Sequence, residues 1–394
     1  MKGKVSKLWR REGAQSVAAS LISILIGLAV GAVIILIMGL SNPDLGLGTV
    51  WEAVRLEFLG LFSIGRTATG ALTFGFNPVS MGDMLFRATP LILTGLSVAV
   101  AYKTGLFNIG APGQYLMGTA ATLMLALGIP TQVVPAPLVW LIAFLGGALA
   151  GALWGCIPGL VKALLNINEV LACIMTNWIA ANLVSWIFDG SQFRNLAEST
   201  KSAYIYKTSF NGVQTAKLGL DQLFPNSQVN GGILVAIVIA VLMYILMNKT
   251  TLGYQLKACG ANRHASRYAG IADKRNIVLS MAIAGAFAGV GGAIYYLSGT
   301  AQFTIIKTLV NMGFNGIPVA LLASSHPIGT IFSSLFISYI QVGGESLQPE
   351  FAKEIIDIII AAIIYLSAFA LLVQGGIARL LSRKHERAAG KEED

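Results

Sequence analysis

Long apolar stretches alternate with short polar ones along most of the chain. About 20 consecutive apolar residues are enough to span a bilayer as a helix. Ten stretches approach that length: 17–40, 84–102, 105–128, 137–161, 169–188, 231–248, 277–298, 309–325, 327–343 and 354–374. The pattern predicts an all-α polytopic membrane protein with about ten transmembrane helices.

The polar segments divide the chain around this predicted transmembrane domain, 17–374. We expect cytoplasmic tails at 1–16 and 375–394, an external loop at 189–230 and a cytoplasmic loop at 249–276. Segment 41–83 contains an amphipathic stretch and glycine-rich turns, which favours an external hairpin or an interfacial helix. The run 17–40 is longer than the apolar region of a secretory signal, so it is predicted to be a membrane helix.

Basic residues indicate the orientation, because cytoplasmic loops carry an excess of lysine and arginine. With ten spans and a cytoplasmic N-terminus, the inside holds twice as many basic residues as the outside. Both termini are therefore expected in the cytoplasm.

The composition supports a protein solvated mainly by lipid. The chain is 55% hydrophobic and 11% charged, whereas soluble domains carry about 25% charged residues. The net charge of +9 does not indicate nucleic-acid binding, since the basic residues occupy short segments between apolar runs. The three cysteines show no metal-ligand or disulfide spacing and are interpreted as small buried hydrophobes.

The loop 249–276 combines six basic residues with one acid, Asp273. This basic loop is long enough to contact a soluble partner. Within it, Ala261, Ala265, Tyr268 and Ala269 recur at helical spacing, which predicts a short helix whose small residues could fit a groove on that partner. The alternative is an amphipathic turn of no further significance.

Glycines in two predicted spans indicate close helix packing. Span 137–161 has Gly147, Gly151, Gly155 and Gly159 on one helical face, and span 277–298 has Gly285 and Gly289. Small residues at this spacing let two backbones approach one another.

Two segments share a Phe-Asn pair beside glycine, followed by proline. They are GLFNIGAPGQ, starting at Gly105, and MGFNGIPVALLA, starting at Met312. Spans 2–5 and 7–10 would then form an inverted repeat, with broken helices near a substrate site. A chance similarity remains the alternative.

Neutral amides at these breaks are the candidate lining of a substrate pathway, because irregular backbone at membrane depth lies in protein or beside a wet cavity. The alternative is that they join helices by hydrogen bonds. Trp178 could add a stacking surface, although lone aromatic residues in membrane helices more often serve packing or lie at the membrane interface. The candidate pathway residues are Phe107, Asn108, Gln114, Asn177, Trp178, Asn311 and Asn315.

The chain offers no catalytic cluster, metal site, cofactor motif or phosphate-binding loop. Its carboxylates fall near span ends, which disfavours ion-coupled transport. We therefore expect a transport subunit, not an enzyme, whose energy comes from a partner.

The motif near Asn108 and the G-A-N-x-x-A-S-x-Y-A-G-I loop resemble the permease subunits of bacterial ABC importers, in the nucleoside branch of the branched-chain amino acid and simple-sugar permeases. The resemblance implies a vitamin-B12-importer-like architecture, in which segment 260–271 is the coupling helix that contacts the ATPase. The implied coupling residues are Gly260, Ala261, Asn262, Ala265, Tyr268, Ala269, Gly270 and Ile271. Pro112 stands where the family often has an acidic residue.

This resemblance also implies partners and a location. They are a second permease chain, a cytoplasmic ATP-binding subunit, an external substrate-binding lipoprotein and a nucleoside, in the bacterial plasma membrane. Sugar or branched-chain amino acid permeases, a stand-alone secondary transporter, a membrane enzyme and a purely structural subunit remain alternatives.

Overall fold

The computed structural model describes residues 12–41, 46–67, 71–197, 201–202 and 213–348, and the single positions 358, 361, 362 and 365. It contains two compact units, 1–77 with 339–394 and 78–338, and each is described by itself. Apart from those four positions, the predicted span 354–374 and the tail 375–394 lie outside the described residues, as does most of the tail 1–16.

The described part of the first unit includes two helices, a small hairpin and the end of α15 (Pro327–Glu345). Helix α2 (Glu12–Ser41) precedes α3 (Leu47–Leu59), the 3-10 turn η1 (Gly60–Phe62) and the antiparallel strands β1 (Ser63–Arg66) and β2 (Leu72–Phe74). Because Gly39 of α2 has no side chain, Val50 of α3 can pack directly against it. Segment 41–83 thus contains both a helix and a hairpin, the two forms that its sequence favoured.

Helix α3 contains a buried acid. Glu57 is 4% exposed, and neither of its carboxylate oxygens has a hydrogen-bond partner among the residues that the structure describes. Burial disfavours the charged form and raises the pKa of Glu57 to about 8.

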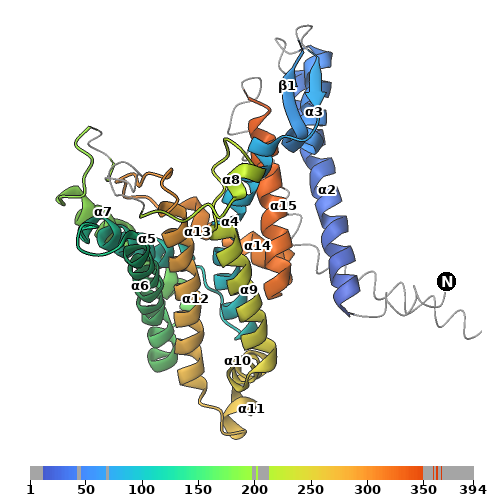
Figure 1. The fold of residues 1–394 in the computed structure, drawn as a ribbon. Coiled ribbons are helices and arrows are strands. Elements are labelled where there is room, and N and C mark those ends of the chain that lie inside the picture. Colours follow the sequence, from blue (N-terminus) through green and yellow to red (C-terminus); the bar gives the residue numbers. More distant parts are fainter. Residues whose placement is uncertain are drawn as a thin grey trace, which may run out of the picture. The chain divides into compact units, whose positions relative to one another are not determined.

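The second unit is a helical bundle (Figure 1). Its helices are α4 (Pro78–Lys103), α5 (Ala111–Gly128), α6 (Ala136–Leu165), α7 (Glu169–Asp189), α8 (Leu220–Leu223), α9 (Gly232–Lys249), α10 (Thr251–Ala261), α11 (Arg263–Tyr268), α12 (Asp273–Tyr296), α13 (Asn311–Phe314), α14 (Gly316–Leu322) and the first part of α15 (Pro327–Glu345).

Five helices in the described part of the chain are long and apolar enough to cross a membrane: α4, α6, α7, α9 and α12. A sixth candidate is the segment from α13 through α15, which bends by 119° at its break. This bend lies between Leu322 and Pro327, where the predicted spans 309–325 and 327–343 meet. Within 309–325 the structure has two short helices, α13 and α14, separated at Asn315. The structure establishes a polytopic α-helical protein with five or six described candidate spans.

The predicted close packing at the glycine faces of these two spans is confirmed, and the structure shows that the two faces pack on each other. Gly147, Gly151 and Gly155 of α6 face α12, and a side chain at Gly151 would collide with the carbonyl of Gly285. A side chain at Gly289 would collide with the carbonyl of Gly147. The two backbones therefore touch along several turns, and any larger residue there would force them apart.

The opposite side of α6 is apolar and exposed. Leu145, Leu149 and Leu153 lie on it, each more than half exposed. Helix α4, by contrast, is mostly buried among other helices. This division fits a bundle in which α4 is central and α6 borders lipid or another chain.

Candidate functional site

The basic loop consists of two helices, α10 and α11, which lie beyond the ends of α9 and α12 (Figure 1). The Thr250 hydroxyl caps α10 by accepting a hydrogen bond from the Gly253 N–H at 3.1 Å. The Asn262 side chain caps α11 by accepting from the Ala265 N–H at 3.0 Å. Sequence analysis predicted a helix within 260–271 but not the separate helix α10.

Glycine ends the second of these helices. Gly270 has φ of +79°, and its N–H donates to the Arg267 carbonyl at 3.0 Å. This left-handed conformation is common just after a helix and is unfavourable for residues with a side chain. The chain can therefore turn sharply from α11 towards α12.

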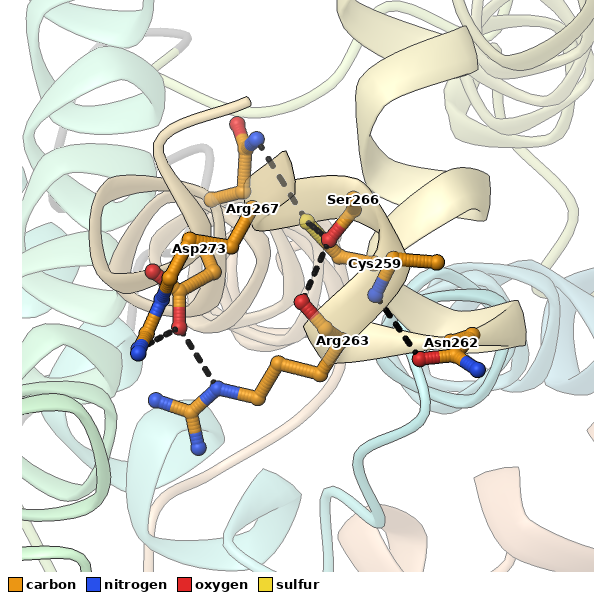
Figure 2. A network of polar contacts seen from close by, with 8 residues as sticks. Cys259, Asn262, Arg263, Ser266, Arg267 and Asp273 are labelled. Carbon is orange, nitrogen blue, oxygen red and sulfur yellow. Dashed lines mark hydrogen bonds and ion pairs between the residues drawn. The ribbon is translucent and has the colours of Figure 1, made fainter. Parts of the chain in front are cut away.

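One buried carboxylate holds α11 against the start of α12 (Figure 2). The side chain of Asp273, 8% exposed, accepts from Arg263 Nε at 2.7 Å and from Arg267 at 2.9 Å. The Asp273 carboxylate raises the pKa of Arg267 above its usual value, mainly through this hydrogen bond. Two guanidinium groups on one carboxylate fix the position of α11, and we call these three residues the Asp273 clamp.

Sulfur contacts tie the same helices to α10 (Figure 2). Ser266 Oγ donates a hydrogen bond to Cys259 Sγ at 3.6 Å. Asn276 Nδ2 donates to the same sulfur at 3.7 Å. All three residues are buried. Sequence analysis did not predict these contacts, although Cys259, Ser266 and Asn276 all occur within the basic loop.

The predicted coupling residues do not share one environment. Tyr268 is 95% exposed, and Ala261, Ala265, Ala269 and Gly270 are exposed as well. Ile271 is half-buried and Asn262 is the cap of α11. The side of α11 that faces away from the bundle is therefore exposed.

Gly260, in contrast, belongs to an internal contact. A side chain there would collide with the carbonyl of Lys103 and lie 2.9 Å from the Gly105 nitrogen. Gly105 itself has φ of +75°. Gly260 thus allows α10 to pack on the turn that follows α4.

The amides at the first break form a closed network. The Asn108 Nδ2 donates to Ser97 Oγ at 2.9 Å and to Gln114 Oε1 at 2.8 Å. Gln114 Nε2 donates back to Asn108 Oδ1 at 3.0 Å. Asn108 and Gln114 are both fully buried, so this pair fixes the irregular segment before α5.

Asn177 of α7 binds the same irregular segment. Its Oδ1 accepts from the Gly113 N–H at 2.9 Å, and its Nδ2 donates to the Ile109 carbonyl at 2.9 Å. The neighbouring Trp178 is 49% exposed and does not join this network. Phe107 is half-buried.

The two similar motifs meet in space. Gly313 lies against Pro112, so closely that a side chain at Gly313 would collide with the proline backbone. In this second segment Asn311 is exposed and Asn315 is half-buried. The predicted pathway residues therefore lie on the two touching breaks and on α7. Asn108, Gln114 and Asn177 are buried, whereas Trp178 and Asn311 are exposed.

A family of known proteins matches most of the chain. The model of the family described as "Branched-chain amino acid transport system / permease component" matches residues 80–368. This chain belongs to that permease family. Membership makes it a transport subunit and a multi-pass membrane protein.

Several characterised relatives of this permease are similar over almost their whole length. It is 34% identical to the guanosine ABC transporter permease NupP of Bacillus subtilis, over 91% of this chain and 95% of the relative. It is also 34% identical to the nucleoside ABC transporter permease NupB of Lactococcus lactis, over 96% of this chain and 97% of the relative. The glucose ABC transporter permease TsgB13 of Haloferax volcanii is 29% identical, over 84% and 86%.

A second set of relatives shows lower similarity to this permease. The guanosine ABC transporter permease NupQ of Bacillus subtilis is 26% identical over 65% of this chain and 79% of its own length. The nucleoside permease NupC of Lactococcus lactis is 26% identical over 68% and 83%. In each of these two organisms at least two permeases are thus similar to this chain, and NupP and NupB are more similar to it than NupQ and NupC.

Proposed function

We propose that this permease is one of two membrane subunits of an ATP-driven importer for nucleosides. The observation that carries the proposal is 34% identity to both NupP and NupB over more than nine-tenths of the chain. The glucose permease is less similar, at 29%, and sugar transport is the second candidate function.

The second membrane subunit is proposed to be a NupQ-like or NupC-like chain. Two organisms each have one relative at 34% and another at 26% identity, a pattern that favours a heterodimer over two copies of this chain. A cytoplasmic ATP-binding subunit and an external substrate-binding lipoprotein complete the proposed complex.

We propose that residues 260–271 dock on the ATP-binding subunit. The exposed side of α11, with Tyr268 at its end, supports this role because it offers small side chains beside an aromatic anchor. The Asp273 clamp then transmits displacement of α11 to α12. This docking requires α11 to face the cytoplasm, and the distribution of basic residues favours that side for α11 and for both termini.

The substrate pathway is proposed to run beside the two touching breaks. Asn311 and Asn315 offer neutral donors and acceptors suited to the base and hydroxyl groups of an uncharged nucleoside. Phe107, Asn108, Gln114, Asn177 and Trp178 complete the proposed set, with the buried amides holding the break in place. The contact of Gly313 with Pro112 supports two related halves of opposite orientation.

Energy dependence tests this proposal against a stand-alone secondary transporter. The complex is reconstituted in proteoliposomes with the binding protein, and uptake of radiolabelled guanosine is measured with ATP, without ATP and after an ionophore removes ion gradients. The proposal predicts uptake that requires ATP and persists with the ionophore. Uptake without ATP that the ionophore abolishes would favour the secondary transporter.

A further inference from the structure

A basic cavity separate from the amide network lies at one end of the bundle. It has a volume of about 270 Å³ and is formed by the ends of α4 and α9, helix α10 and the turn between α14 and α15. All of these elements belong to the second unit. The lining residues are Ala99, Lys103, Met243, Met247, Asn248, Lys257, Ser325, His326 and Pro327.

The polar side of this cavity consists mainly of hydrogen-bond donors. Lys103 and Lys257 each carry an ammonium group, which has three donors and no acceptor. One donor of Lys257 is used by Asn248 Oδ1 at 3.3 Å. None of the described residues that line the cavity is acidic. Two cations beside one cavity repel each other, and an anion between them would relieve that repulsion.

His326 adds a neutral donor. Its Nδ1 accepts from the Gly329 N–H at 3.3 Å, so the neutral ring carries its proton on Nε2. The ring packs against Tyr244 with 5.7 Å between ring centroids, which fixes its orientation. The neutral histidine that lines the cavity therefore keeps Nε2–H as its ring donor.

The turn that carries His326 is conformationally unusual. Ser324 and Ser325 have φ of +50° and +54°, a region that few residues other than glycine, asparagine and aspartate adopt. The Ser325 N–H donates to the Ala320 carbonyl at 2.7 Å, and this bond helps to hold the turn. The turn brings Ser325 and His326 to the same cavity as the lysines of α4 and α10.

We propose that this cavity binds a phosphate group, supplied by an anionic phospholipid headgroup or by a soluble phosphate compound. Ammonium and N–H donors with no opposing carboxylate match phosphate oxygens. The volume is below the range of about 300–1,000 Å³ typical of sites that enclose a drug-sized ligand, so a single headgroup fits better than a whole nucleotide. Met243, Met247 and Ala99 give the remaining wall an apolar character suited to lipid.

Native mass spectrometry of the assembled complex tests this inference. The complex is titrated with phosphatidylglycerol, with phosphatidylcholine, and with phosphatidylglycerol in the presence of inorganic phosphate or AMP. We expect preferential binding of phosphatidylglycerol, weakened about fivefold by either Lys103→Gln or Lys257→Gln and further by the double substitution. Lys249→Gln is the matched control, because Lys249 is a lysine at the end of α9, next to the lining residue Asn248, but does not itself line the cavity.

The competition arm identifies the source of the phosphate group. Displacement of phosphatidylglycerol by inorganic phosphate or AMP, dependent on the two lysines, supports the site and assigns it a soluble ligand. No displacement together with lysine-dependent lipid binding assigns it a headgroup. Equal binding of both lipids, or the same binding by the wild type and both single variants, overturns the proposal. Because transport is not the measured quantity, the outcome is independent of the proposed nucleoside function.

Discussion

Arg263 Nε lies 2.7 Å from Asp273 Oδ2, which joins the first residue of α11 to the first residue of α12. Arg267 binds the same oxygen at 2.9 Å. Helix α12 in turn packs backbone to backbone on α6 through their glycines. A displacement of α11 would therefore reach the bundle through a short and stiff connection.

Replacing Asp273 with asparagine should uncouple α11 from α12. The substitution keeps the shape of the side chain and removes the charge that holds two guanidinium groups. We expect uptake and substrate-stimulated ATPase activity to fall together by roughly tenfold, which corresponds to about 1.4 kcal/mol, in a complex that still assembles.

Asp189→Asn is the control for this clamp, because Asp189 forms an exposed pair with Arg194 at 3.3 Å outside the basic loop. Such surface pairs contribute only about 0–1 kcal/mol, so this variant should retain activity. Full ATPase stimulation in the Asp273→Asn complex would contradict the clamp.

Gly270→Val should impair coupling through backbone strain. No atom lies within 4 Å of a side chain built at Gly270, but its φ of +79° is unfavourable for valine by about 1–2 kcal/mol. Uptake and substrate-stimulated ATPase should both decrease while the subunits remain associated.

Gly219→Val is the control for Gly270→Val, because it introduces a similar backbone strain elsewhere in the chain. Gly219 has φ of +80° and the same open surroundings, but it lies before α8, outside the basic loop. If both glycine variants lost activity equally, general strain would be the cause and coupling would not be indicated.

Substitution of the amides should separate structural from substrate-contacting positions. Asn108→Ala leaves the buried donors and acceptors of Gln114 and Ser97 without their partner, at a cost of about 1–3 kcal/mol per unsatisfied group. We expect a lower melting temperature of the purified complex.

Asn311→Ala should act differently, because Asn311 is exposed. We expect an unchanged melting temperature and a severalfold higher KM for nucleoside uptake, consistent with the loss of about 1 kcal/mol of binding. An unchanged KM would exclude Asn311 from the pathway.

Glu57→Gln should stabilise the protein at neutral and alkaline pH. Burial raises the pKa of Glu57 from 4.5 to about 8, so the folded state retains a proton that the unfolded state loses. The contribution of Glu57 to the free energy of unfolding is therefore fully present below pH 4.5, and it decreases as pH rises towards 8. The size of this pKa change limits the loss of stability to roughly 5 kcal/mol.

Thermal unfolding between pH 5 and 8 measures this difference. The wild type should lose stability relative to Glu57→Gln across the range. Glu52→Gln, on the same helix, removes a pair with Arg66 at 2.7 Å and should not reproduce the pH-dependent gain. Parallel curves for the wild type and Glu57→Gln would show that Glu57 ionises normally.

Local patterns predicted some of these features well. The glycine repeat in 137–161 identified the face of α6 that meets α12, because helical periodicity alone determines which residues share a face. The polar composition of 249–276 concealed α10, although Thr250 is a favourable cap and Gly253, Leu256 and Cys259 are buried at helical spacing.

Other features depend on contacts that sequence does not specify. Asn108 looked suited to a pathway, but its amide is saturated by Ser97 and Gln114. Gly260 is a predicted coupling residue, and nothing in the sequence indicated that it also packs on the turn at Gly105. Such partners follow from how α4, α5 and α10 pack, which no single segment determines.

Substrate competition tests the central claim most directly. Uptake of radiolabelled guanosine, ribose and leucine is measured separately in cells with and without this permease, and guanosine uptake is competed with unlabelled guanosine, ribose or leucine. The nucleoside assignment predicts that uptake is lost without the permease, restored by its gene and blocked only by the nucleoside. Unchanged guanosine uptake, with loss of ribose or leucine uptake, would contradict it.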